Sequence, residues 1–296
     1  MRWIKFSLLS LAIIFLLALC MPVGYFVLHD SDEQPSVSSL EQPHGFVTYV
    51  INLERSKSRW DYILPNIQKL PFPIARIPAV DGYKLTQDEI TRDFDLQSYH
   101  AYIDFPVRVG IVGCALSHIK AWRAFLASDY EFAIIFEDDV ILSPEKILQI
   151  ARNLEKNKEY WDIVNLVADH RGRPLTIKSF EDKTNLVVYL SRTTNAGAYI
   201  INRQAAAQLI KKALPIVLPN DLYFSRGWEL GLKYTGIEPR LSREIFGGST
   251  VMTSKKSDEV YKRNIKDMIT QKMFVFQTSV IRCVYNVWTF IKLKTT

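Results

Sequence analysis

Three consecutive carboxylates, Glu137, Asp138 and Asp139, are the residues of this sequence best suited to chemistry. They directly follow the apolar, β-rich run 132–136, so we expect them at the carboxyl end of a buried strand. Adjacent carboxylates repel one another, and burial penalises their charged form, so a buried cluster needs a compensating cation. Mg²⁺ and Mn²⁺ favour oxygen ligands and often bind one or two carboxylates together with substrate phosphates.

The pattern also indicates which of the three would bind the ion. Alternate residues of a strand share a face, so Glu137 and Asp139 are the predicted metal ligands and Asp138 points away. Ligands of open α/β sheets bind at the carboxyl ends of strands, which is where the triplet falls. The other interpretation is a solvated acidic turn between a strand and a helix, and the triplet alone does not decide between the two.

The segments around the triplet alternate between strand and helix patterns. Strands are predicted at residues 46–53, 75–80, 132–136, 162–167, 186–190 and 198–201. Helices are predicted from residue 55 to the prolines at 71 and 73, at 113–128, from the Ser143-Pro144 start signal onward, and at 204–214. This alternation predicts an α/β fold, a mainly parallel sheet with helices on both faces.

Four segments, in order, resemble glycosyltransferase family 25, which includes lipooligosaccharide galactosyltransferases of bacteria and collagen galactosyltransferases of animals. They are the strand with two arginines at 50–59, the Ala-Val-Asp-Gly block at 79–82, the Gly-Cys-x-x-Ser-His helix at 113–118 with Trp122, and Phe-Glu-Asp-Asp-Val at 136–140. Weaker similarities occur at 197–202 and 219–221. Together the segments span about residues 46–225.

The resemblance implies a GT-A type, Rossmann-like fold that joins a nucleotide half to an acceptor half. It implies a UDP-sugar donor, UDP-galactose or UDP-glucose, and a glycan, lipooligosaccharide or glycoprotein acceptor. The family is inverting, so the sugar would move in a single displacement with a base deprotonating the acceptor hydroxyl. Manganese or magnesium would neutralise the charge that develops on the departing UDP.

The resemblance also assigns roles to residues. The metal ligands would be Glu137 and Asp139, and Asp138 would support them or contact the ribose. The donor-binding residues would be Arg55, Arg59, Asp81, Ser117 and His118. Each has a plainer interpretation: a basic helix start for the arginines, a turn for Asp81, and packing inside the fold for His118.

Asp221 is the predicted general base, and Glu229 and Asp169 are its rivals. The aromatic residues Tyr223, Phe224 and Trp228 either stack on sugars or belong to the core. Two other functions remain open from the sequence: a catalytically silent binding protein of the same family, and a metal-dependent phosphohydrolase.

Residues 1–30 are predicted to be a short cytoplasmic tail and a membrane anchor. Phe6 to Leu28 contains no charged residue, and a helix of that length spans about 35 Å, enough to cross a bilayer of about 30 Å. A cleaved signal peptide is the alternative. The Ser-, Gln- and Pro-containing residues 31–45 are predicted to be a flexible stalk, 46–250 the catalytic domain, and 251–296 a basic and apolar tail.

Arg2 and Lys5 precede the apolar segment and acidic residues follow it, which predicts a single-pass protein with a cytoplasmic N-terminus. Both a Golgi-like type II arrangement and a bacterial inner membrane fit this. In the bacterial case UDP-sugars are cytosolic, so the side that the catalytic domain faces stays open. The tail segment 273–293 is either an amphipathic helix on the membrane surface or a helix packed on the catalytic domain.

Composition excludes several classes of protein. Of 296 residues, 48 % are hydrophobic and 23 % are charged, which excludes disordered, collagenous and coiled-coil chains. A net charge of +6 is mild for this length, and we expect no nucleic-acid partner. The three cysteines lie far apart, with neither a disulfide framework nor zinc-like spacing.

Overall fold

The computed structural model describes residues 45–241, 244–245 and 265–295. The chain divides into two units, Met1–Gln42 and Pro43–Thr296. The predicted anchor at 1–30 and all but the last residue of the predicted stalk at 31–45 lie outside the described residues. So do 242–243 and 246–250 of the predicted catalytic domain and 251–264 and 296 of the predicted tail.

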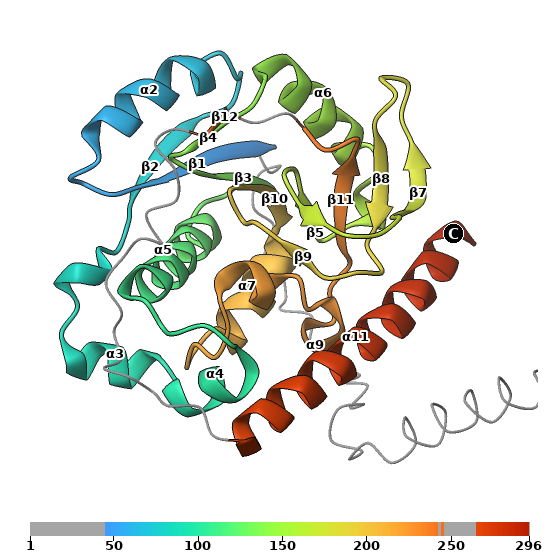
Figure 1. Cartoon of the computed structure of the whole chain (residues 1–296). Coiled ribbons are helices and arrows are strands. Elements are labelled where there is room, and N and C mark those ends of the chain that lie inside the picture. Colours follow the sequence, from blue (N-terminus) through green and yellow to red (C-terminus); the bar gives the residue numbers. More distant parts are fainter. Residues whose placement is uncertain (1–44, 242–243, 246–264, 296) are drawn as a thin grey trace, which may run out of the picture. The chain divides into compact units, whose positions relative to one another are not determined.

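An eight-stranded sheet forms the centre of the second unit (Figure 1). Its order is β2-β1-β3-β10-β5-β11-β8-β7. The strands are β1 (Phe46–Asn52), β2 (Ile74–Pro78), β3 (Phe132–Glu137), β5 (Ile163–Asn165), β7 (Leu175–Ser179), β8 (Asn185–Val188), β10 (Ala198–Asn202) and β11 (Tyr234–Glu238). Two smaller ladders pair β4 (Val140–Ile141) with β12 (Glu244–Ile245) and β6 (Asp169–His170) with β9 (Thr193–Thr194).

The prediction of a mainly parallel sheet is wrong. Four of the seven neighbouring pairs in the large sheet are antiparallel, because β10 and β8 run against their neighbours. A parallel return needs a crossover connection, usually a helix. Between β5 and β10 the chain forms only short strands, so β10 enters the sheet at the edge where β3 ends, and the Glu137 N–H donates to the Gly197 carbonyl at 2.8 Å.

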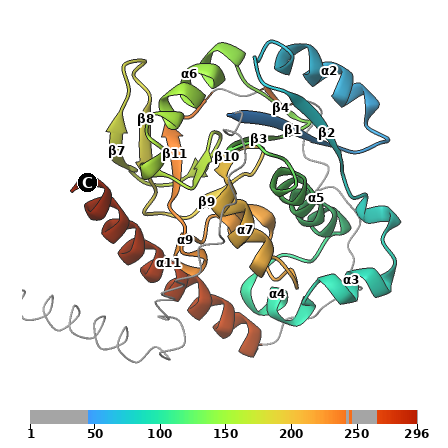
Figure 2. The same cartoon turned by 180° about the vertical axis from the view of Figure 1, so that it is seen from behind.

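Helices cover both faces of the sheet, as predicted. Helices α2 (Lys57–Ile67) and α6 (Pro144–Glu155) pack on one face, and α5 (Val109–Leu126) and α7 (Arg203–Lys212) pack on the other (Figures 1 and 2). The β3 side chains alternate between these two cores, since Phe132 and Phe136 join the first and Ala133 and Ile135 the second. The fold is therefore a mixed α/β layer structure of the Rossmann-like kind.

The remaining helices are short, with one exception. They are α3 (Gln87–Asp93), α4 (Leu96–Tyr102), α8 (Asn220–Phe224), α9 (Gly227–Leu230), and the single turns η2 (Gly82–Lys84) and η3 (Lys158–Tyr160). The exception is α11 (Ile265–Lys294), which contacts α4, α9 and β7. This part of the tail is therefore a helix packed on the domain.

Among the described helices, α5 is the one long and apolar enough to cross a membrane by length and composition, but most of it is buried inside the fold. It is a core helix, and it carries Cys114, Ser117 and His118.

Arg203 fixes the carboxyl end of α5. Its guanidinium donates to the carbonyls of Leu126 at 2.8 Å, Ser128 at 2.6 Å and Tyr130 at 3.1 Å, and it lies over the Phe125 ring at 5.6 Å. The last carbonyls of a helix lack partners within the helix and carry partial negative charge. A side chain from the start of α7 therefore satisfies the end of α5.

We predict that Arg203→Met lowers the free energy of unfolding by about 2 kcal/mol, the usual scale for lost hydrogen bonds from a charged donor. Chemical denaturation monitored by circular dichroism measures this. Arg152→Met, at an exposed position of α6, is the matched control and should change stability by less than about 0.5 kcal/mol. Equal effects of the two substitutions would contradict the role of Arg203.

Candidate functional site

The predicted site residues meet at one edge of the sheet. Strands β1, β2 and β3 are parallel, so their carboxyl ends lie together, with α5 beside them. A cleft of about 90 Å³ opens there. Eight of the nine predicted site residues line it: Arg55, Arg59, Asp81, Ser117, His118, Glu137, Asp138 and Asp139.

Asp138 is held on both sides of its carboxylate. Its side chain is buried, the Asn52 amide donates to Oδ2 at 2.6 Å, and the Arg59 guanidinium donates to Oδ1 at 3.0 Å. Arg59 also lies 3.5 Å from Asp139. Asp138 thus fixes the one buried arginine of the cleft against the acidic triplet.

Sequence reasoning assigned no role to Asn52. Its side chain contacts both Arg76 and Asp138, and Asp138 in turn binds Arg59. Asn52 is 1 % exposed and is the last residue of β1. Its amide nitrogen donates to Asp138, and its Oδ1 accepts from Arg76 Nε at 2.8 Å. A polar amide at the end of an otherwise apolar strand was the signal, because buried polar groups require partners.

Glu137 and Asp139 are less compensated than Asp138. The Glu137 side chain is 28 % exposed and lies 3.2 Å from His118 Nε2. Burial, then the charge of Glu137, raises the pKa of Asp139 to about 7. The cleft contains four carboxylates, Asp81 included, but two arginines, and Arg55 is paired with Asp81. The end of β3 therefore has an excess of negative charge that a cation would relieve.

A buried hydrogen-bond chain orients the Glu137 carboxylate. The Trp122 indole donates to the Tyr199 hydroxyl at 2.9 Å, and that hydroxyl lies 2.8 Å from His118 Nδ1. An indole can only donate, so the Tyr199 hydroxyl is free to donate to Nδ1. This leaves Nε2–H directed at Glu137, a tautomer that we infer from the network.

Three potential metal ligands lie close together around Glu137. The ligand atoms of Cys114, His118 and Glu137 lie within 4.8 Å of one another, and Cys114 Sγ is 3.8 Å from Glu137 Oε1. Burial raises the pKa of the Cys114 thiol well above its usual range, and the charge of Glu137 adds to this. A protonated thiol is a poor ligand, so the oxygens of Glu137 and Asp139 are the better donors for a hard cation.

Ser117 joins α5 to the loop after β2. Its hydroxyl donates to the Gly113 carbonyl at 2.6 Å and accepts from the Val80 N–H at 2.8 Å. A Cβ at Gly113 would lie 2.6 Å from the Val80 carbonyl oxygen, so this approach requires glycine. The loop in turn holds Asp81, which pairs with Arg55. The structure thus places Ser117 where it supports the wall of the cleft.

Asp221 does not line the cleft but lies near it. It is in α8, and its carboxylate accepts the N–H groups of Asn195 at 3.0 Å and Leu222 at 2.8 Å. Burial raises its pKa, and the charge of Glu137 acts in the same direction. Asn195 has a φ of 80°, a strained conformation for a residue with a side chain, and sequence reasoning missed it.

The two rivals of Asp221 are engaged by arginines. Asp169 pairs with Arg240 and accepts from the Asn195 amide at 3.2 Å. Glu229 accepts both arms of Arg226, with Nε 2.6 Å from Oε2. Among the described residues, no arginine pairs with Asp221 in this way.

The three candidate aromatic residues have different surroundings. Phe224 is fully buried and stacks on Tyr199, and the Tyr223 hydroxyl donates to the Leu209 carbonyl at 2.6 Å. Trp228 has the guanidinium carbons of Arg226 and Arg282 at 5.0 and 5.3 Å from its ring centroid. The first two are thus held by packing, whereas Trp228 lies among cations.

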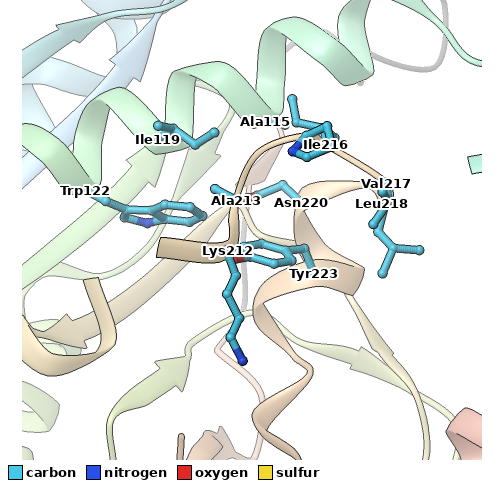
Figure 3. Close-up of a pocket in the computed structure, with 11 residues that line it drawn as sticks. Ala115, Ile119, Trp122, Lys212, Ala213, Ile216, Val217, Leu218, Asn220 and Tyr223 are labelled. Atoms are coloured by element: carbon cyan, nitrogen blue, oxygen red, sulfur yellow. The ribbon is translucent and has the colours of Figure 1, made fainter. Parts of the chain in front are cut away.

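A second, smaller pocket lies beside α5 (Figure 3). Its volume is about 20 Å³, and Trp122, Asn220 and Tyr223 are among the residues that line it. The Asn220 amide nitrogen is buried there without a partner among the described residues. This space suits about one water molecule, so it does not compete with the cleft as a nucleotide site.

The raised pKa of Asp139 predicts a pH dependence of stability. An unfolded aspartate ionises near pH 4, whereas Asp139 ionises at about 7 in the fold. The unfolded chain therefore loses this proton first as pH rises. We predict that the free energy of unfolding of the metal-free protein falls, on the order of 1–3 kcal/mol, between about pH 4 and pH 7 and then levels off.

Urea titrations at several pH values in EDTA measure this slope. Asp139→Asn should remove most of it, and Asp61→Asn, at an exposed position of α2, should leave it intact. A slope that persists in Asp139→Asn would show that other groups cause it.

Comparison with known proteins agrees with this geometry. Residues 46–224 match the family described as glycosyltransferase family 25 (LPS biosynthesis protein). A glycosyltransferase 25 family member of Aedes aegypti is 30 % identical over 188 residues, which cover 59 % of this chain and 30 % of the relative. Human procollagen galactosyltransferase 2 is 24 % identical over 169 residues, 55 % of this chain and 27 % of the relative.

Another human relative is named inactive glycosyltransferase 25 family member 3, and it is 25 % identical over 214 residues, 66 % of this chain and 36 % of the relative. The chain thus spans about a third or less of the length of these relatives. The match over residues 46–224 includes every predicted site residue, and the chain belongs to glycosyltransferase family 25.

Proposed function

We propose that this protein transfers a hexose, galactose or glucose, from a UDP-sugar to a glycan, lipooligosaccharide or glycoprotein acceptor with inversion. The observation that supports this most is the excess negative charge of Glu137 and Asp139 in the cleft that the family match covers. A procollagen galactosyltransferase among the relatives supports the choice of galactose.

Glu137 and Asp139 would hold Mn²⁺ or Mg²⁺ in this cleft. When bound, the ion supplies positive charge to the diphosphate of the leaving group. His118 orients Glu137, and Asp138 holds Arg59 against the triplet. Arg55 is half-exposed and lies over the Tyr83 ring at 5.6 Å, in reach of a phosphate or uracil that enters the cleft.

Asp221 would take the proton of the acceptor hydroxyl as that oxygen forms its bond to the anomeric carbon. The bond from this carbon to the UDP oxygen breaks in the same step, and its electron pair leaves with UDP. A base works best when its pKa is close to the working pH, and burial moves the pKa of Asp221 upward.

A catalytically silent protein is the second candidate, and the relative named inactive favours it. The two differ in what they release. A transferase releases UDP when both the donor and the acceptor are present, whereas a silent binding protein releases no UDP. A metal-dependent phosphohydrolase would release nucleotide or phosphate irrespective of the acceptor.

We also propose that Phe6 to Leu28 anchors the protein in a membrane with the N-terminus in the cytoplasm, and that residues 31–45 link the anchor to the catalytic domain. The uncharged length of the segment and the preceding Arg2 and Lys5 support this. Both a Golgi-like and a bacterial inner-membrane arrangement are consistent with it. Resistance of the full chain to carbonate extraction from membranes tests the anchor.

Glu137→Gln and Asp139→Asn keep size and remove charge, so we predict that each weakens Mn²⁺ binding at least about tenfold and lowers transfer at least about a hundredfold. Calorimetric titration with Mn²⁺ and UDP, and mass spectrometry of a sugar-bearing product, measure the two effects. Asp61→Asn is the control of equal charge change. Unchanged metal affinity in both variants would refute the metal role of β3.

We predict that Asp221→Asn lowers turnover about a hundredfold or more and leaves the affinity for UDP within about twofold, because the base acts on the acceptor and not on the donor. Asp169→Asn serves as the matched comparison at the rival carboxylate and should retain turnover. Loss of turnover in Asp169→Asn but not in Asp221→Asn would move the base to Asp169.

A further inference from the structure

The C-terminal helix α11 exposes an apolar face. Twelve large hydrophobic side chains are exposed in the described part of the chain, and nine of them are on α11. They are Ile265, Met268, Ile269, Met273, Val275, Phe276, Val284, Trp288 and Ile291. Val284 is 60 % exposed, Trp288 54 % and Ile291 55 %. Soluble surfaces rarely gather apolar side chains in this way without a partner.

This exposure is not the result of an undocked helix. The inner face of α11 is attached to the domain by specific contacts: the Asn286 amide donates to the Tyr189 carbonyl at 2.7 Å, the Tyr285 hydroxyl donates to the Leu232 carbonyl at 3.2 Å, and Phe274 stacks on Tyr102 at 4.2 Å. Figures 1 and 2 show the helix lying along one side of the domain near α4 and α9.

The side chains that α11 buries are unusual for a surface helix. Three of its four buried residues, Thr278, Asn286 and Thr289, are polar, and Leu293 is the fourth, whereas nine large apolar side chains are exposed. A surface helix of a soluble protein turns its apolar stripe toward the core. The sequence of α11 is thus matched to an apolar environment outside the domain.

Lysines lie at both ends of this face. Lys266 and Lys272 are exposed near the start of α11, and Lys292 and Lys294 are exposed near its end, whereas Asp267 is the one acidic residue of the helix. Lys292 Nζ lies 5.2 Å from the Trp288 ring centroid. A tryptophan beside a lysine is typical of the boundary between lipid tails and head groups.

We propose that α11 lies in the surface of an anionic lipid bilayer, with its apolar face among the acyl chains and its lysines among the head groups. The net positive charge of α11 complements anionic lipids, which attract basic residues near the membrane surface. The helix extends for about 45 Å at its rise per residue, long enough to fix the orientation of the domain on the bilayer. The proposal does not depend on the sugar transfer.

The bilayer explains the pattern better than a second copy of the chain does. Because lysines occupy both ends of the face, pairing two copies in either direction would set lysines against lysines. The N-terminal sequence also supports a bilayer as the partner of α11. Its apolar run ends at Leu28, and β1 begins at Phe46. That interval spans at most about 60 Å when extended, so an anchored chain would keep α11 within reach of the same membrane.

Fluorescence quenching of the full chain reconstituted into vesicles tests the proposal. Cys20, Cys114 and Cys283 are changed to serine, and an environment-sensitive dye is attached through Val284→Cys or Ile291→Cys. Asp61→Cys on α2 is the control, since both views place α2 on the side of the domain away from α11. Vesicles of phosphatidylcholine with about 30 % phosphatidylglycerol carry spin labels on the acyl chains.

We expect acyl-chain spin labels to reduce the emission at positions 284 and 291 at least about twofold and to leave that at position 61 unchanged. Changing the four lysines of α11 to glutamine should reduce this quenching while the thermal unfolding midpoint stays the same. Quenching no greater at 284 and 291 than at 61 would overturn the proposal.

In detergent solution, the emission of the same dye distinguishes a lipid bilayer from a protein segment as the group that covers the apolar face of α11. Emission already shifted to the blue without a bilayer would mean that protein covers the face, which would also overturn the proposal. Shielding that rises with protein concentration would identify a second copy, and shielding independent of concentration would identify the apolar segment Phe6 to Leu28.

Discussion

The site depends on one electrostatic constraint: β3 ends in three carboxylates for which the fold supplies one buried arginine. Arg59 and Asn52 donate hydrogen bonds to Asp138, and little positive charge remains to compensate the carboxylates of Glu137 and Asp139. Because burial and mutual repulsion raise the pKa of Asp139 to about 7, this arrangement costs stability in the absence of a cation. Other residues at this edge of the sheet support the acidic cluster. The hydrogen-bond chain through Tyr199 and His118 orients Glu137, and Ser117 holds the loop that carries Asp81.

Several features of the fold and site could be predicted because they depend on local pattern. The apolar runs located β1, β3 and β10, and the Ser143-Pro144 signal located the start of α6, where the Ser143 hydroxyl accepts the Lys146 N–H. Parallel strands end at one edge, so placing Arg59, Asp81 and Glu137 after such strands was sufficient to bring them together.

Other features were not visible in the sequence because they depend on long-range pairing. The reversal of β10 follows from the path of the chain through β6–β9, which no local periodicity records. The partners of Asn52, Tyr199 and Asn195 lie 86, 81 and 26 residues away. Likewise, α11 has an apolar sequence, but only its packing shows that Thr278, Asn286 and Thr289 are buried while nine large apolar side chains are exposed.

Anomalous scattering from crystals grown with Mn²⁺ and UDP tests the central claim most directly. We expect a manganese peak within bonding distance of Glu137 and Asp139 carboxylate oxygens, next to the diphosphate, with Asp138 still bound to Arg59 and Asn52. Manganese and UDP bound away from the end of β3, with both carboxylates unliganded, would contradict it.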